Sequence, residues 1–184
     1  MDSLSDNSLM LKVKSGDIQR LGLLYERYKK RLFGFFYQMG HDGDLSEDLV
    51  QNVFIKVLKY RHTYTDQSTF ISWLFKIARN TSYDHFNNNK KNQGNLDISK
   101  VNHKISDHTI IDEQIILEEN RTTLARALQL LPAEKREVLI LSKLKELKYL
   151  EVGNIIGCSE GTARTKVHRA LSDLKDVFFK LEKR

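Results

Sequence analysis

The sequence has few residues that interrupt helices, cross-link a chain or bind zinc. Its 184 residues include nine glycines, one proline, Pro132, and one cysteine, Cys158. Because glycine and proline are the strongest local breakers of regular structure, their scarcity favours long, uninterrupted helices. A single cysteine excludes an internal disulfide framework and any zinc site built from several cysteines.

Long apolar runs are also missing. Stretches such as LFGFF are far too short to cross a bilayer, which takes about 18 or more consecutive apolar residues. No signal peptide is recognisable. We therefore expect a cytoplasmic protein without membrane insertion.

The charge balance is modestly basic, with 30 Lys and Arg against 24 Asp and Glu and a net charge of +6. This excess is compatible with nucleic-acid binding but does not establish it. No metal-spaced histidine cluster, glycine-rich phosphate loop or nucleophile–base pair is present, so catalysis is disfavoured and neither a cofactor nor a metal is expected.

Apolar residues at helical spacing predict three amphipathic helices in the first half of the chain. Asp17 is expected to cap the first, Asp44 with Glu47 to form a capping box for the second, and Ser68 to cap the third. Gly40 can end the first helix in a left-handed turn. The predicted ranges are 18–39, 45–60 and 70–88.

A polar stretch without aromatic residues follows and predicts a flexible linker over 93–117. The second domain is then expected at 118–184, with helices near 118–131, 134–146, 149–156 and 160–179. The fold class is all-α: two small helical domains, 1–92 and 118–184, joined by the linker, with no strand-like alternation and no internal repeat.

The stretch GCSEGTARTKVHRAL, residues 157–171, has the pattern of a helix-turn-helix. Gly153 is the small residue at which the second helix can cross the first closely, and Gly157 tolerates the positive φ of the turn. Cys158 fits as an apolar plug rather than a redox group. Ser159 can cap the helix that follows.

That last helix is amphipathic in one direction only. Ala163, Val167, Ala170 and Leu174 share one face, and the basic residues lie on the opposite face. A helix of this kind can press one side against a core and place the other in a major groove. A solvated surface helix is the alternative, but the glycines, the plug and the cap favour DNA binding. The predicted contacts are Thr162, Arg164, Thr165, Lys166, His168 and Arg169.

Two segments of the second domain, LPAEKREVLIL and YLEVGNIIGCSEGTARTKVHRALSDLK, resemble the C-terminal domain of bacterial sigma factors of the extracytoplasmic-function (ECF) group. In the first domain, EDLVQNVFIKVLKY and FISWLFKIARNTSYDHF resemble the second conserved region of the same family. The resemblance covers about residues 11–91 and 118–180. It implies an initiation factor that binds core RNA polymerase, reads the −35 duplex and the melted −10 strand, and has no catalysis of its own.

The resemblance assigns the −10 strand to the third helix and the loop before it. Lysine can neutralise phosphates, tyrosine can stack on bases, and asparagine can pair with base edges, which suits an unpaired strand. Tyr64 is equally compatible with receiving a flipped base and with ordinary loop packing, whereas Trp73 is expected in the core. The candidate −10 contacts are Tyr64, Lys76, Asn80, Tyr83 and Asn87.

The outward face of the helix at 45–60 mixes a carboxylate, amides and an exposed aliphatic side chain, as protein-docking surfaces do. The resemblance assigns this face, with Asp48, Gln51, Asn52 and Ile55, to the β′ clamp helices of polymerase. It also implies a contact with the β flap and an anti-sigma factor as partner.

The chain departs from the family pattern at several positions. Asn52 stands where the family usually has Glu, and NNNKK replaces a cluster of Arg and Lys, so attraction to the DNA backbone should be weaker there. Glu146 and Lys148 replace a glycine and a Ser or Thr cap. We expect an irregular turn at this point without loss of the fold.

Two other interpretations of the sequence are alternatives to a sigma factor. The first is a helix-turn-helix regulator that binds duplex DNA without polymerase. The second is a helical adaptor for protein interactions with incidental basic faces. Run-off transcription with core polymerase distinguishes a sigma factor from both alternatives, because only a sigma factor is expected to make initiation depend on the protein.

Overall fold

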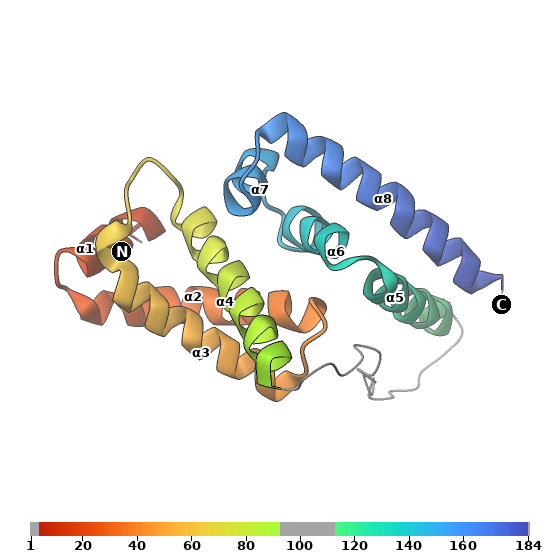
Figure 1. Cartoon of the computed structure of the whole chain (residues 1–184), viewed down its shortest axis with the longest axis horizontal. Coiled ribbons are helices and arrows are strands. Elements are labelled where there is room, and N and C mark those ends of the chain that lie inside the picture. Colours follow the sequence, from red (N-terminus) through yellow and green to blue (C-terminus); the bar gives the residue numbers. More distant parts are fainter. Residues whose placement is uncertain (1–3, 93–112, 184) are drawn as a thin grey trace.

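The structure, a computed structural model, describes residues 4–92 and 113–183, and every regular element in these ranges is helical. The helices form two groups, α1–α4 and α5–α8, in agreement with the predicted all-α class (Figure 1). Most of the predicted linker, residues 93–112, lies outside the described residues. The second group begins at Glu113 rather than at 118, because α5 extends toward the N-terminus.

The first domain is built from four α-helices and two single-turn 3₁₀ helices. Its core is aromatic-rich, with Phe35, Phe36, Phe70 and Phe75 fully buried. The elements are α1 (Asp6–Lys14), η1 (Ile18–Arg20), α2 (Leu21–Gln38), α3 (Gly43–Tyr60), η2 (Arg61–Thr63) and α4 (Phe70–Asn92).

Helix α1 was not predicted from the sequence. Ser5 caps it by accepting from the amide of Ser8 at 3.2 Å, and Leu9, Met10 and Val13 are fully buried against the rest of the domain. The helix is only nine residues long, so its stability comes from packing rather than from local propensity.

The helix caps observed in the first domain differ from the predicted ones. Asp17 takes the predicted N-cap position before Ile18, but the first turn is the 3₁₀ helix η1, which runs directly into α2 at Leu21. The Asp17 carboxylate makes no capping bond and accepts from Arg20 at 3.1 Å. Asp42, not Asp44, caps α3 by accepting from the Leu45 amide at 2.8 Å. Either aspartate matches the local cap pattern, so the path of the preceding turn decided between them.

At α4, Thr69 takes the role predicted for Ser68, since its hydroxyl accepts from the Ser72 amide. Gly40 has φ 101°, the left-handed end predicted for α2.

The second domain consists of α5 (Glu113–Leu130), α6 (Ala133–Leu139), the π-helical turn η3 (Ile140–Leu144), α7 (Tyr149–Ile156) and α8 (Glu160–Glu182). The irregular turn expected near Glu146 is present, because Glu146 has φ 57° and is the one non-glycine residue with positive φ in the described ranges. The Lys148 amide donates to the Glu151 carboxylate at 3.0 Å. This hydrogen bond caps the N-terminus of α7 in the absence of a Ser or Thr at position 148.

The two domains pack directly on each other. Helix α7 lies against α4 (Figure 1), and the end of α2 is tied to α5 and α6. The Arg136 guanidinium donates to the Met39 carbonyl at 2.9 Å, and the Gln129 amide donates to the Gln38 carbonyl at 3.0 Å. Arg31 donates to the Lys145 carbonyl at 2.7 Å. Buried residues of both domains therefore form one continuous core.

Candidate nucleic-acid and polymerase interfaces

The predicted helix-turn-helix is formed by α7, the turn at Gly157 and α8. Gly157 has φ 79°, and the amides of Gly157 and Cys158 both donate to the Gly153 carbonyl, at 2.8 and 2.9 Å. A Cβ on Gly153 would lie 2.6 Å from the Cys158 carbonyl oxygen. The two glycines therefore meet two different needs: Gly157 supplies the left-handed residue and Gly153 the close approach.

The start of α8 is fixed as predicted. The Ser159 hydroxyl accepts from the Thr162 amide at 3.2 Å. Cys158 is half-buried and packs against the core, which agrees with the packing role rather than a reactive one. Ala163, Val167 and Ala170 are fully buried, so the opposite face of α8 is turned outward.

All six predicted −35 contacts are exposed on α8. The Arg164 guanidinium lies over the Tyr149 ring at 5.4 Å and within 3.9 Å of Glu160, while the His168 ring is 6.5 Å from the same tyrosine. Tyr149 of α7 thus supports two side chains of the outward face. Lys166 and Arg169 are both exposed, and the charge of Lys166 also acts on the buried Glu137 of α6, where it opposes the rise in that carboxyl's pKa.

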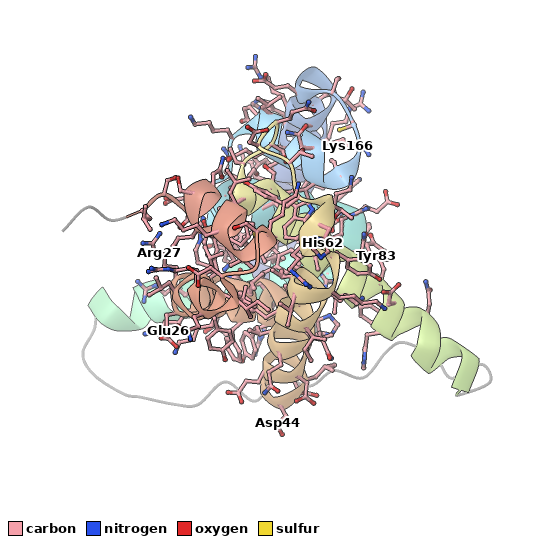
Figure 2. The ribbon with its side chains drawn as sticks, turned by 90° about the vertical axis from the view of Figure 1, so that its left-hand side faces the viewer. Glu26, Arg27, Asp44, His62, Tyr83 and Lys166 are labelled. Atoms are coloured by element: carbon pink, nitrogen blue, oxygen red, sulfur yellow. The ribbon has the colours of Figure 1, made fainter. Side chains whose placement is uncertain are left out.

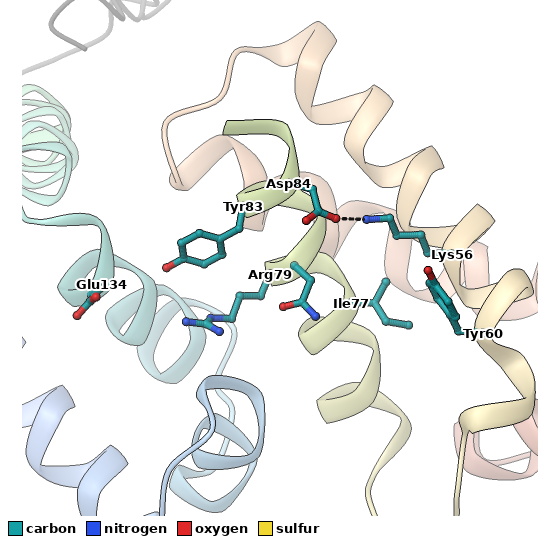
Figure 3. A pocket seen from close by; sticks show the side chains of 8 residues that line it. Lys56, Tyr60, Ile77, Arg79, Tyr83, Asp84 and Glu134 are labelled. Atoms are coloured by element: carbon teal, nitrogen blue, oxygen red, sulfur yellow. Dashed lines mark hydrogen bonds and ion pairs between the residues drawn. The ribbon is translucent and has the colours of Figure 1, made fainter. Parts of the chain in front are cut away.

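Four of the five predicted −10 residues share the outward side of α4: Lys76, Asn80, Tyr83 and Asn87 are all exposed. Asn80 and Tyr83 line a cavity of about 550 Å³ between α3, α4 and α6. Figure 3 shows Arg79 and Tyr83 pointing from α4 toward α6, with the Lys56–Asp84 ion pair, 2.7 Å long, on the other side. The full lining is Lys56, Tyr60, Ile77, Arg79, Asn80, Tyr83, Asp84 and Glu134.

Tyr64 does not join this group. Its side chain is fully buried, with ring contacts to Phe70 at 6.2 Å and Trp73 at 5.3 Å. Burial raises its pKa to about 12. The side chain fills the core under the loop, and a base cannot reach it in this arrangement. Tyr64 thus packs beneath the loop, as one of its two interpretations predicts, and Trp73 packs against the same core as expected.

The predicted polymerase-docking residues Asp48, Gln51, Asn52 and Ile55 are all exposed on α3, and Ile55 retains 63% of its surface. An exposed isoleucine within a polar face is the feature expected of a docking surface. In Figure 2, Asp44 at the start of α3 and Lys166 of α8 lie at opposite ends of the view. The predicted docking residues and the predicted −35 contacts lie on two different helices, α3 and α8.

Two charged residues in the interface between the domains were missed from the sequence. Arg79 of α4 donates to the Glu137 carboxylate of α6 at 3.0 Å, and Glu137 is 2% exposed. Burial raises the pKa of Glu137, and the Arg79 charge opposes that rise. A signal was present, because Glu137 is four residues before Leu141 on the apolar stripe, a position where a carboxylate needs a partner.

Within the described residues, no group of three or more His, Cys, Asp or Glu side chains is placed to hold a metal ion. None of the helices in residues 4–92 and 113–183 is long and apolar enough to cross a membrane.

Comparison with known proteins identifies the family of the chain. The sigma-70 region 2 family matches residues 24–92, and the sigma-70 region 4 family matches residues 121–174. RNA polymerase sigma factor CarQ of Myxococcus xanthus is 31% identical over 163 residues, covering 86% of this chain and 89% of its own. RNA polymerase sigma-H factor of Pseudomonas aeruginosa is 26% identical over 172 residues, covering 90% and 89%.

Solved structures show the same fold. CnrH in complex with the cytosolic domain of CnrY is 20% identical with a TM-score of 0.72, covering 95% of this chain and 97% of its own. RpoE of Bartonella quintana, in complex with the anti-sigma factor NepR, is 26% identical with a TM-score of 0.66, covering 88% and 96%. The ECF RNA polymerase sigma-E factor of Escherichia coli is 26% identical over 176 residues, covering 92% of this chain and 92% of its own. Both regions in order, with these relatives over most of the chain, place the protein in the ECF group of RNA polymerase sigma factors.

Proposed function

We propose that this sigma factor directs core polymerase to promoters by reading duplex DNA with α8 and a melted strand with α4. The observation that carries this proposal is the presence, on one chain, of a helix-turn-helix with six exposed candidate contacts and a second helix with an exposed Lys–Asn–Tyr–Asn side. A regulator that binds only duplex DNA has no need of the second surface. The sigma family membership favours the same choice.

The docking surface for the β′ clamp helices is assigned to α3, with Ile55 as its exposed aliphatic residue, and the contact with the β flap is assigned to the second domain. The protein has no catalytic activity of its own and acts in the cytoplasm. The relatives CnrH and RpoE were solved bound to CnrY and to NepR, and an anti-sigma factor is proposed as a partner here as well.

Run-off transcription with purified core polymerase tests the function. Initiation at defined start sites must depend on this protein, whereas tight binding to a palindromic duplex without polymerase, and no initiation, would favour the regulator. Candidate templates come from sequencing of DNA bound by the reconstituted holoenzyme.

The duplex-reading role is tested with Arg164→Ala. Loss of one base contact should weaken binding to the −35 duplex by about 1–3 kcal/mol. Lys180→Ala is the matched control, since it removes an exposed cation near the other end of α8. Unchanged promoter preference in Arg164→Ala would show that Arg164 makes no base contact in the −35 duplex.

The strand-reading role is tested with Asn80→Ala. It should impair promoter opening, measured by permanganate reactivity, more than initial binding of closed duplex. Arg164→Ala should show the opposite order of effects, and an equal loss of both steps in Asn80→Ala would count against the strand-reading role.

Docking is tested with Ile55→Glu, which replaces the exposed aliphatic side chain of the proposed contact by a charge and should weaken core polymerase binding at least tenfold, about 1.4 kcal/mol. Ile18→Glu is the control, since Ile18 is 46% exposed outside the proposed surface. Equal affinity of the two variants would argue against the α3 assignment.

A further inference from the structure

Helix α1 precedes the residues that match the sigma-70 region 2 family, which begin at residue 24. It packs against η2 and the start of α4, the two elements on either side of the loop at residues 64–69 (Figure 1). The loop leads directly into α4, the helix proposed to hold the melted strand. The contacts between α1 and the two ends of this loop therefore bear on how the strand is read.

The carboxyl end of α1 holds the first residue of the loop. The Lys14 ammonium donates to the Tyr64 carbonyl at 2.6 Å, a contact between residues 50 positions apart. The Tyr64 side chain is fully buried, and its ring lies 5.3 Å from the Trp73 ring of α4. A carbonyl beside a buried side chain needs a donor, and a charged donor forms a stronger hydrogen bond than a neutral one. Lys14 thus fixes the backbone at the point where the loop leaves the core.

The amino end of α1 holds the other end of the loop. The Asn7 side-chain oxygen accepts from the Phe70 amide at 2.8 Å. Phe70 is the first residue of α4, and the amides in the first turn of a helix have no partner within the helix. Asn7 therefore supplies α4 with a cap from a different helix, in addition to the local cap by Thr69.

Helix α1 is itself fastened to α2. The Asp6 carboxylate accepts from the Arg27 guanidinium and from the Tyr28 hydroxyl, both at 2.5 Å. Three apolar side chains of α1 are also fully buried. The helix is thus a fixed support, and the two contacts that it makes with the loop determine where the loop begins and ends.

Between these two contacts, the loop presents Thr65, Asp66 and Gln67 to solvent. A hydroxyl, a carboxylate and a carboxamide are side-chain groups that hydrogen-bond to the edges of bases. Such contacts discriminate between bases only while the backbone that carries them is held in place, because hydrogen bonds weaken steeply when donor and acceptor are misaligned. A base preference of this loop would therefore depend on its two contacts with α1.

We propose that α1 is a positioning element for promoter reading: Asn7 and Lys14 fix the two ends of the loop at residues 64–69, and the fixed loop sets a base preference in the melted strand. The inference rests on the proposed function for the presence of that strand. Neither side chain needs to touch DNA, since both bind the loop backbone. The buried Tyr64 then anchors the loop instead of receiving a base.

The emission of Trp73 in the full-length free chain tests the two anchors. Trp73 is the only tryptophan of the chain and contacts the Tyr64 ring, so its emission reports movement of the loop. Lys14→Met and Asn7→Ala should shift the emission maximum to longer wavelength, because water reaches the indole when the loop loosens.

Two variants serve as controls for this measurement. Lys14→Arg keeps a charged donor, and Lys12→Met removes an exposed cation from the same helix, so both should keep the wild-type emission. Circular dichroism confirms that every variant is folded. Wild-type emission in folded Lys14→Met and Asn7→Ala would overturn the anchoring.

Base selection by the reconstituted holoenzyme tests the positioning role. The templates carry one −35 duplex and a randomised −10 element, and those retained in heparin-resistant open complexes are sequenced. At the most selective −10 position, the ratio of the preferred base to the others should fall about fivefold or more in Lys14→Met and Asn7→Ala, the low end of what one base contact discriminates. The conservative variants Lys14→Arg and Asn7→Asp, and the control Lys12→Met, should keep the wild-type ratio.

A purely structural role of α1 would reduce open complexes on all templates equally. An unchanged ratio in Lys14→Met and Asn7→Ala would therefore overturn the positioning role, whatever the total yield of open complexes. Failure of the proposed function has a different result, since the wild-type chain would then form no open complex on any template.

Discussion

Gly153→Ala tests the close approach inside the helix-turn-helix. Gly153 is fully inside α7, where alanine normally stabilises a helix by about 1 kcal/mol relative to glycine. Here the new Cβ would lie 2.6 Å from the Cys158 carbonyl oxygen and 3.3 Å from two backbone atoms of Ser159. These atoms belong to the turn and cannot rotate away as a flexible side chain can.

The clash must therefore shift α8 relative to α7. Overpacking of a tight interior costs about 1–3 kcal/mol, and backbone neighbours place this site at the upper end. Subtracting the propensity gain of about 1 kcal/mol leaves a net destabilisation of about 1–2 kcal/mol. In a chain of this size the corresponding fall in Tm is about 2–4 °C per kcal/mol.

Chemical denaturation followed by circular dichroism measures the effect, and Gly161→Ala is the matched control. Gly161 lies in the first turn of α8 with nothing within 4 Å of an added Cβ. That variant should be neutral or more stable by up to about 1 kcal/mol. If Gly153→Ala were as stable as Gly161→Ala, the argument that the motif needs a small residue at 153 would be refuted.

Three further outcomes follow from single sites. Glu146→Gly should raise the free energy of unfolding by about 0.5–1 kcal/mol, because glycine adopts a φ of 57° without strain; Glu146→Ala should give no such gain. Arg136→Ala should lower the free energy of unfolding by about 3 kcal/mol, since the guanidinium donates to the carbonyls of Met39, Leu128, Gln129 and Leu131; unchanged stability would show that these carbonyls find other donors. Burial, with the nearby His85 second, lowers the pKa of His41 from 6.5 to about 4, so the unfolded chain binds a proton that the folded chain excludes. The free energy of unfolding should then fall by up to about 3 kcal/mol as the pH drops from 6.5 to 4, and His41→Gln should flatten this part of the pH profile.

The parts of the site that could be predicted depend on neighbouring residues. The roles of Gly157, Cys158 and Ser159 depend on one turn of chain, and each residue has the role that its type predicts: left-handed turn, core contact and helix cap. The stripe of Ala163, Val167 and Ala170 fixes which side of α8 is buried, and the exposed basic residues follow from it. Helical periodicity alone carries this information.

Tyr64 shows where such reasoning reaches its limit. A tyrosine in a polar loop can face solvent or pack beneath the loop, and the sequence leaves both open. The choice depends on Phe70 and Trp73, which enclose its ring. Helix α1 has the same character, because a nine-residue helix forms only when the core accepts its apolar side.

The sequence by itself determined the helices other than α1, their order in two domains and the outward face of α8, because caps, glycines and apolar spacing act over a few residues. Only the tertiary structure decided that Glu137 of α6 pairs with Arg79 of α4. That contact joins residues 58 positions apart, and no local preference encodes it. Its physical cause is burial: a carboxylate removed from water requires a counter-charge, and the packing of the two domains supplies one.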